Sequence, residues 1–215
     1  MSRIWQQQLQ MTFSLPSRLL DYICQLERSP NYSHKMWDGL ESDEMIEIKK
    51  LMYSQLWRVQ KGRCAYCGML KLSEQLDREH FLPKRYYLKL MFHPYNIVLA
   101  CKQCNRDFKR WNNPLSVSTK HGYLARKYGV VFRSFSFKYW HPYFHDPAEH
   151  FSYSGLYNAK IKHLNQVGFD TIRLFGWQKK SSILARIQNE AIFDKLRNGE
   201  ISSQDLDLVG RILNY

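Results

Sequence analysis

The chain has 215 residues, of which 44% are hydrophobic and 15% aromatic, so it can bury a sizeable core and we expect one domain with additions. No apolar run approaches the ~18 residues of a membrane span. Residues 1–24 lack a basic region followed by an apolar one, which argues against a signal peptide. We therefore expect a cytoplasmic protein without a membrane segment.

The net charge of +13 is concentrated in the middle of the chain. Residues 61–110 hold eleven basic and four acidic side chains, and residues 120–180 hold ten and three. Residues 1–60, with seven of each, and residues 181–215, with four and five, are nearly balanced. A central excess of Lys and Arg fits a groove that neutralises phosphates, with a generic basic surface as the alternative.

Helix signals dominate residues 1–60, which we interpret as an N-terminal helical region. Pro16 predicts a helix from about residue 15 to residue 28, and Pro30 then favours a loop. A second helix is predicted over residues 42–61, because acidic residues follow Ser42, apolar residues recur with the 3.6-residue period, and Gly62 ends the pattern.

Shorter elements are predicted after residue 60. Strands near residues 75–80 and 96–99 and a helix near 104–111 belong to a central unit, residues 61–115. Residues 116–215 are interpreted as a C-terminal α+β extension. Its predicted elements are a strand at 130–140, a hairpin around Ser154-Gly155, and helices near 160–174, 182–197 and 203–213.

Four of the five cysteines form two close pairs, Cys64-x-x-Cys67 and Cys101-x-x-Cys104. Four thiolates in this arrangement predict a closed, tetrahedral, structural Zn²⁺ site. The cysteines also suit a reducing compartment, where close pairs of thiols bind metal rather than oxidise to disulfides. Cys24 stands apart from the two pairs, and we expect it to be a buried core thiol.

An acid–imidazole pair, Glu79-His80, lies between the cysteine pairs with Pro83 three residues after the histidine, and Asn96 and Asn105 follow. This pattern resembles the motif of the HNH endonucleases, in its zinc-stabilised form. The chain has Glu79 where many members have Asp, and Asn105 where the family name has its last His. The resemblance implies an α+β fold, with a zinc-stabilised ββα-metal core inside a mostly helical domain and a small additional β-hairpin region.

The resemblance also implies roles for the four polar residues. His80 would be the general base, since a neutral imidazole accepts a proton near pH 7; a buried core histidine is the alternative. Glu79 and Asn105 would bind a catalytic Mg²⁺ or Mn²⁺ through oxygen. The alternatives are a solvated strand carboxylate for Glu79 and a helix N-cap for Asn105. Asn96 would orient the loop or His80, with an ordinary turn asparagine as an equal alternative.

Basic side chains cluster around this motif and are expected to contact nucleic acid, with a solvated basic face as the alternative. They are Lys84, Arg85, Lys89, Lys102, Arg106, Lys109 and Arg110. A second group, His141, His145, Asp146 and His150, suggests a second metal site. We favour instead a loop packed by Tyr143, Phe144 and Phe151.

A wider string resembles the PtuB-type nucleases of Septu and retron antiviral systems. It includes Glu79-His-Phe-x-Pro-Lys84, Asn113-Pro-Leu115 and His141-Pro-Tyr-Phe-x-Asp-Pro147. This resemblance implies a PtuA-like ATPase partner and an antiviral role. The expected function is metal-dependent hydrolysis of DNA phosphodiesters. Two alternatives stay open: cleavage of RNA such as tRNA, and a zinc-stabilised nucleic-acid-binding module without catalysis.

Overall fold

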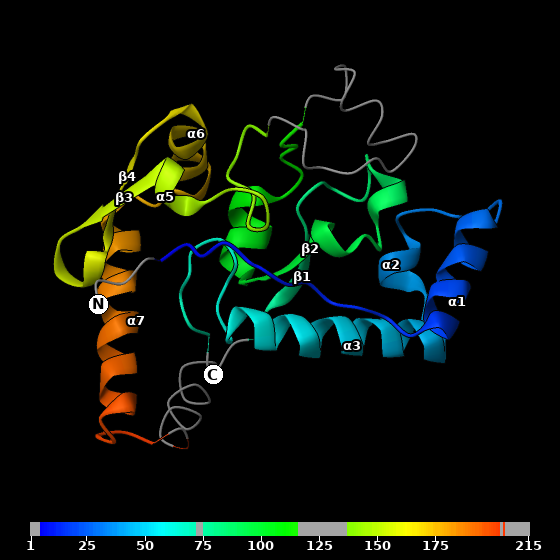
Figure 1. Cartoon of the computed structure of the whole chain (residues 1–215), viewed down its shortest axis with the longest axis horizontal. Helices are drawn as coiled ribbons and strands as arrows, with labels where there is room; N and C mark the ends of the chain where they lie inside the picture. The colour runs from blue at the N-terminus through cyan, green and yellow to red at the C-terminus, as the bar shows by residue number, and fades with distance from the viewer. Residues whose placement is uncertain (1–4, 72–74, 116–136, 203, 205–215) are drawn as a thin grey trace.

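The computed structural model describes residues 5–71, 75–115, 137–202 and 204. In this part of the chain the fold is α+β, with two separate two-stranded antiparallel sheets set among helices. Figure 1 shows the first sheet at the centre, with α3 running beneath it, α1 and α2 at one end, and the second sheet with α6 and α7 at the other end. No helix among the described residues is both long and apolar enough to cross a membrane.

Three helices form the N-terminal end: α1 (Ser17–Arg28), α2 (Met36–Gly39) and α3 (Asp43–Gln60). The Ser42 hydroxyl caps α3 by accepting a hydrogen bond from the Met45 amide at 3.3 Å. Lys61 ends α3 in a left-handed conformation with φ 53°. The two helices predicted in this region are confirmed.

Cys24 lies on the exposed side of α1, so the prediction of a buried core thiol is wrong. The helix buries Leu19 and Ile23, which are four residues apart and share one face. Cys24 follows Ile23 and lies about 100° further around the helix axis. Its side chain therefore points away from the buried stripe.

The central sheet pairs β1 (Asp77–His80) with β2 (Ile97–Ala100) in antiparallel register, which confirms the two predicted strands. All four residues of β2 are apolar and buried. The side-chain amide of Gln60 covers the other edge of β2, because it bonds both the N–H and the carbonyl of Leu99 at 2.8 Å. The end of α3 is thereby fixed to the sheet.

The helix after β2 is η3 (Gln103–Lys109), and it is a π-helix rather than the expected α-helix. The Arg110 N–H bonds the Asn105 carbonyl, five residues earlier, at 2.8 Å. Two 3₁₀ turns, η1 (Leu88–Leu90) and η2 (Pro94–Asn96), lie in the connection from β1 to β2. π-Helical turns are frequent at functional sites, so η3 is a candidate part of such a site.

The C-terminal half holds a second hairpin and two longer helices. Its elements are α5 (Pro147–His150), β3 (Phe151–Ser154), η5 (Leu156–Asn158), β4 (Lys160–His163), α6 (Gln166–Phe175) and α7 (Lys180–Arg197). β3 pairs antiparallel with β4, with Ser154 opposite Lys160, so the hairpin predicted around Ser154-Gly155 is confirmed. The helix predicted near residues 182–197 is confirmed as α7.

The helix predicted from residue 160 is wrong in its first part. Residues 160–163 pair with β3, and the Asn165 side chain caps α6 later by accepting from the Gly168 amide at 2.9 Å. Of the strand predicted over residues 130–140, only 137–140 are described, and these form no strand. The helix predicted over 203–213 lies almost wholly outside the described residues.

The N-terminal segment, residues 5–14, runs across the molecule from the second sheet to α1 (Figure 1). The Trp5 indole donates to the Tyr157 carbonyl at 3.1 Å. The Leu9 amide donates to the Pro142 carbonyl at 2.7 Å. These bonds tie the N-terminal segment to the C-terminal half, which is far away in sequence.

Candidate functional site

The two cysteine pairs meet in a single buried cluster. The sulfur atoms of Cys64, Cys67, Cys101 and Cys104 all lie within 4.8 Å of one another. Tetrahedral Zn–S bonds of about 2.3 Å place sulfur atoms about 3.8 Å apart, so the cluster could hold a zinc ion. Cys101 follows β2 directly and Cys104 lies in η3, so a bound ion would join the sheet to the π-helix.

Backbone geometry supports this cluster. Gly68, just after the first pair, has φ +72°, and a Cβ there would lie 1.9 Å from the Trp5 carbonyl oxygen, so the position requires glycine. The Gly68 amide donates to the Cys64 carbonyl at 3.0 Å, and the Cys101 amide donates to the Cys64 sulfur at 3.3 Å. Amide donation to sulfur stabilises a thiolate.

Helix α7 contacts the loop that follows the first cysteine pair, a contact that no local sequence signal indicated. The Asn189 side chain bonds both the amide and the carbonyl of Leu70, at 3.0 and 2.9 Å. Burial lowers the pKa of Arg186 to about 10, and the nearby Cys67 and Cys104 oppose that effect. Arg186 therefore supplies a buried positive charge near Cys67 and Cys104, whose thiols would be anionic around zinc.

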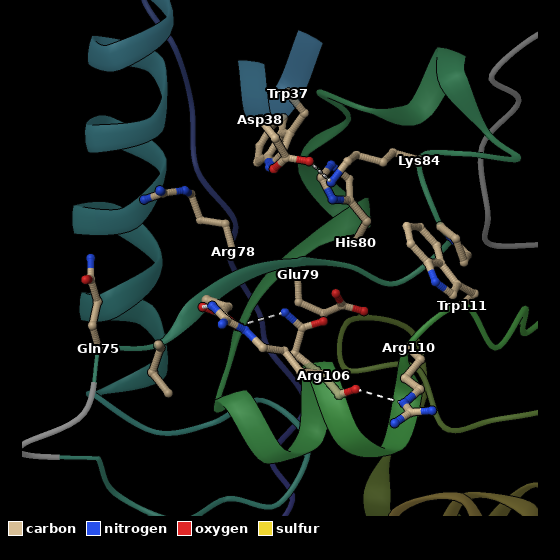
Figure 2. Close-up of a pocket in the computed structure, with 14 residues that line it drawn as sticks. Trp37, Asp38, Gln75, Arg78, Glu79, His80, Lys84, Arg106, Arg110 and Trp111 are labelled. Carbon is tan, nitrogen blue, oxygen red and sulfur yellow. Dashed lines mark hydrogen bonds and ion pairs between the residues drawn. The ribbon is translucent and has the colours of Figure 1, made fainter. Parts of the chain in front are cut away.

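A pocket of about 650 Å³ lies beside β1, between α2 and η3 (Figure 2). Seven residues singled out from the sequence line it: Glu79, His80, Pro83, Lys84, Asn105, Arg106 and Arg110. The sequence did not point to the other seven lining residues: Trp37, Asp38, Gln75, Leu76, Asp77, Arg78 and Trp111. Four of the fourteen are Lys or Arg and three are Asp or Glu, with Lys84 paired to Asp38 and Arg106 to Asp77, so the lining keeps a small positive excess.

Strand alternation divides the four polar side chains of β1 into two pairs that point in different directions. Asp77 and Glu79 contact η3, whereas Arg78 contacts α3 and His80 contacts Trp37 of α2. The sequence analysis did not single out Asp77 and Arg78. Their positions are explained by the two-residue period of the strand, which lies between a helix on each side.

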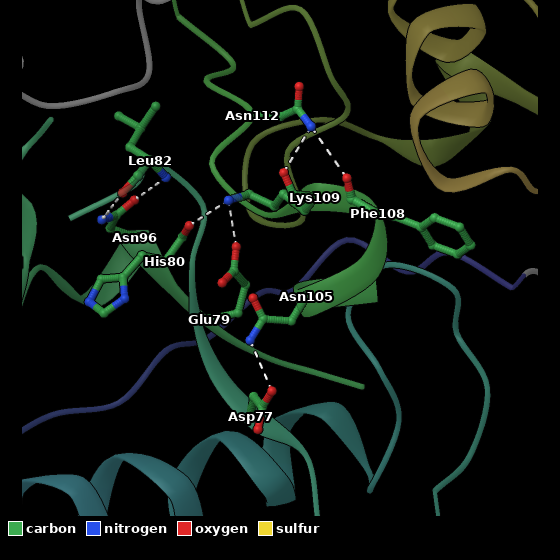
Figure 3. Close-up of polar contacts among 9 residues, drawn as sticks. All are labelled: Asp77, Glu79, His80, Leu82, Asn96, Asn105, Phe108, Lys109 and Asn112. Carbon is green, nitrogen blue, oxygen red and sulfur yellow. Dashed lines mark hydrogen bonds and ion pairs between the residues drawn. The ribbon is translucent and has the colours of Figure 1, made fainter. Parts of the chain in front are cut away.

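Glu79 forms a buried ion pair with Lys109. The Lys109 Nζ lies 2.5 Å from Glu79 Oε1 and donates to the His80 carbonyl at 2.8 Å (Figure 3). The two residues are only 6% and 2% exposed. Burial raises the pKa of Glu79, and the charge of Lys109 opposes that shift. The expectation that Lys109 contacts nucleic acid from a basic surface is therefore wrong, since its ammonium faces inward.

Asn105 and Asp77 form a second polar group in the pocket. The Asn105 amide nitrogen donates to Asp77 at 3.0 Å, and Arg106 donates twice to the same carboxylate, both bonds being 2.8 Å. Because the two atoms of an amide point in opposite directions, the Asn105 carbonyl oxygen faces away from Asp77. In Figure 3 this leaves the Asn105 side chain beside Glu79.

His80 is buried against the edge of the Trp37 ring, with ring centroids 4.5 Å apart. Its Nε2 lies 2.9 Å from the Met91 carbonyl, which only accepts, so Nε2 carries the proton and Nδ1 keeps the lone pair. Burial, reinforced by the charge of Lys84, lowers the pKa of His80 to about 3. The imidazole is therefore neutral across the physiological pH range.

Asn96 is fully buried and does not line the pocket. Its side chain accepts from the Leu82 amide at 2.7 Å and donates to the carbonyls of Leu82 and Leu90 at 3.1 and 2.9 Å. These bonds hold both ends of the loop that carries Lys84. Of the two sequence-based interpretations, loop orientation describes this geometry better than an ordinary turn.

The remaining basic residues are spread around the pocket. Lys84 lines it and pairs with Asp38 at 3.2 Å. Arg85 lies outside the lining, with its guanidinium 6.0 Å from the Trp111 ring centre. Lys89 and Lys102 are not part of the lining.

The histidines of residues 141–150 pack among aromatic rings. The His141 ring stacks on Phe144 with centroids 4.5 Å apart, and His145 accepts from the His141 amide at 3.1 Å. His150 shares a 3.0 Å hydrogen bond with Asn165. Among the described residues, the four-cysteine cluster is the one group of three or more ligands placed to hold a metal. The packed-loop interpretation therefore fits better than a second metal site.

Comparison with known proteins gives no further guidance to function: no protein-family model and no curated protein matches the chain.

Proposed function

We propose that the chain is a metal-dependent HNH endonuclease that hydrolyses phosphodiester bonds in DNA. The observation that carries the proposal is that Glu79, His80 and Asn105 line one pocket together with four cationic side chains. The four-cysteine cluster joins the sheet to the helix that supplies Asn105. A pure zinc-stabilised binding module would not require a buried acid–imidazole pair.

Glu79 and Asn105 fit a hard divalent cation such as Mg²⁺ or Mn²⁺. One carboxylate, one amide oxygen and the open space of the pocket match the habit of Mg²⁺ to keep water and phosphate ligands. Glu79 is buried, and its Lys109 partner indicates that the site favours a nearby positive charge. A bound ion would stabilise the negative charge that develops on the scissile phosphate.

His80 is the proposed proton acceptor. Its Nδ1 lone pair would take a proton from the attacking water as the water oxygen bonds to phosphorus and the bond to the leaving oxygen breaks. The Met91 carbonyl holds the opposite ring nitrogen and sets the tautomer. A pKa of about 3 makes a weak base, but a bound phosphodiester offsets the charge of Lys84 and moves that pKa upward.

Four cations, Arg78, Lys84, Arg106 and Arg110, would hold the phosphate backbone. We also propose, from the sequence resemblance alone, that a PtuA-like ATPase controls the nuclease and that the pair serves antiviral defence.

Single-turnover cleavage of plasmid DNA and of tRNA tests the function, with and without Mg²⁺ or Mn²⁺ and with and without the co-expressed ATPase. His80→Ala should lower the cleavage rate by roughly 10² to 10⁴-fold. His163→Ala, an exposed histidine on β4, is the matched control and should cleave like the parent. Cleavage that persists without divalent ions, or that survives His80→Ala, contradicts the proposal.

A further inference from the structure

Trp111 departs from the pattern set by the other tryptophans. Its side chain is 55% exposed, whereas four of the other five are buried and Trp57 is half-buried. An indole exposed to water forgoes the burial that normally stabilises a fold. Trp111 nevertheless lines the pocket, and Figure 2 shows it at one side of the site, with Arg78 and Gln75 at the other.

The backbone holds Trp111 in this position. Arg110 adopts φ 47° and ψ −123°, a conformation that costs a non-glycine residue roughly 1–3 kcal/mol. The Asn112 side chain stabilises the turn by donating to the carbonyls of Lys109 and Phe108, at 2.9 and 3.3 Å. The chain therefore leaves η3 by a constrained turn that directs the indole outward.

Charge surrounds the ring. The Arg85 guanidinium lies 6.0 Å from the indole centre, and Arg106 and Arg110 line the same pocket. An exposed aromatic ring among cations is the combination that binds single-stranded nucleic acid, with bases stacking on the ring and phosphates meeting the cations. In a duplex both faces of a base are already covered by its neighbours, so an indole stacks only on an unpaired or terminal base.

We propose that Trp111 stacks on an unpaired base next to the scissile phosphate, so that the preferred substrate is single-stranded or locally unpaired DNA. This inference rests on the proposed function, because the same pocket holds the scissile phosphate. A pocket of about 650 Å³ can accommodate a nucleotide. Trp111 acts here in binding and takes no part in proton transfer.

The test measures binding by fluorescence anisotropy in the His80→Ala background, with a labelled DNA strand used alone and as a duplex long enough that its internal base pairs far outnumber its two ends. Trp111→Ala should weaken single-strand binding by roughly 5- to 100-fold, the effect of one lost base–aromatic stack. Duplex binding should be nearly unchanged. Trp111→Phe should retain most of the affinity, and Phe169→Ala, an exposed aromatic on α6, is the matched control.

The two possible failures are distinguishable. Parental single-strand binding by Trp111→Ala, or an equal loss for both DNA forms, overturns the stacking role even if the parent cleaves DNA. Trp111-dependent binding without metal-dependent cleavage by the parent keeps the stacking site and removes the nuclease proposal. No binding of either DNA form overturns both.

Discussion

The ion pair between Glu79 and Lys109 leads to a prediction that separates a metal site from a purely structural pair. Lys109→Met keeps most of the side-chain volume but removes the ammonium, which leaves the Glu79 carboxylate buried without a cation. Breaking a buried pair on one side costs about 3–5 kcal/mol. For a domain of this size the melting temperature should therefore fall by roughly 10 °C.

Divalent ions should then act differently on the variant and the parent. In the Lys109→Met protein, Mg²⁺ or Mn²⁺ can take the place of the ammonium beside Glu79, and saturation about 100-fold above Kd returns about 2.7 kcal/mol. The assay is thermal unfolding across a metal titration, at constant zinc. Glu79→Gln combined with Lys109→Met removes both charges, so its stability should exceed that of Lys109→Met without added metal and respond little to metal.

Lys102→Met is the matched control, because Lys102 directly precedes the same π-helix and is exposed. It should unfold close to the parent at every metal concentration. If Lys109→Met is as stable as Lys102→Met, then Glu79 is not buried in its ionised form. If added metal stabilises neither protein, then Glu79 is not a metal ligand, and either result refutes the reasoning.

Three further predictions concern the zinc cluster, the loop and the buried imidazole. The parent should carry about one zinc per chain by elemental analysis, and Cys101→Ser should lose it and unfold more readily; a folded parent without zinc contradicts the site. Asn96→Ala should lower the free energy of unfolding by about 3 kcal/mol in urea, because buried Leu82 and Leu90 groups lose their partners, whereas the exposed Asn198→Ala should not. The folded pKa of His80, about 3, lies below its ordinary value, so the unfolded chain binds the extra proton. This stabilisation is complete above about pH 6.5 and is lost as the pH falls toward 3. Between about pH 6.5 and about pH 5 the parent should lose up to about 2 kcal/mol more than His80→Gln; equal losses in pH-dependent urea unfolding would exclude a buried neutral imidazole.

Features that depend on residues close together in the sequence could be predicted, because short-range geometry controls them. Each cysteine pair must converge because only two residues separate its members, and the structure joins the two pairs in one cluster. The period of 3.6 and the capping group at Ser42 located α3. Glu79 and His80 could be associated with one site because of the motif that they form with Pro83 and the two cysteine pairs.

The predictions of local structure and burial were wrong where a residue's neighbours in space outweighed its local sequence preference. Residues 160–163 were predicted to begin a helix, yet they form β4 because they pair with the edge of β3. Cys24 was predicted to be a core thiol, yet its side of α1 is exposed in the described part of the chain. Both errors arise because burial depends on neighbours that the local sequence does not contain.

The sequence alone singled out the four cysteines, Glu79 and His80, because they are recognisable from residue type and spacing. Only the tertiary structure decided what surrounds them. It buried Lys109 against Glu79, placed Asn96 under the loop, and left Trp111 exposed at the pocket. The physical reason is that desolvation and ion pairing depend on three-dimensional distance, and the side chains that set them come from α2, β1, the connecting loops and the π-helix.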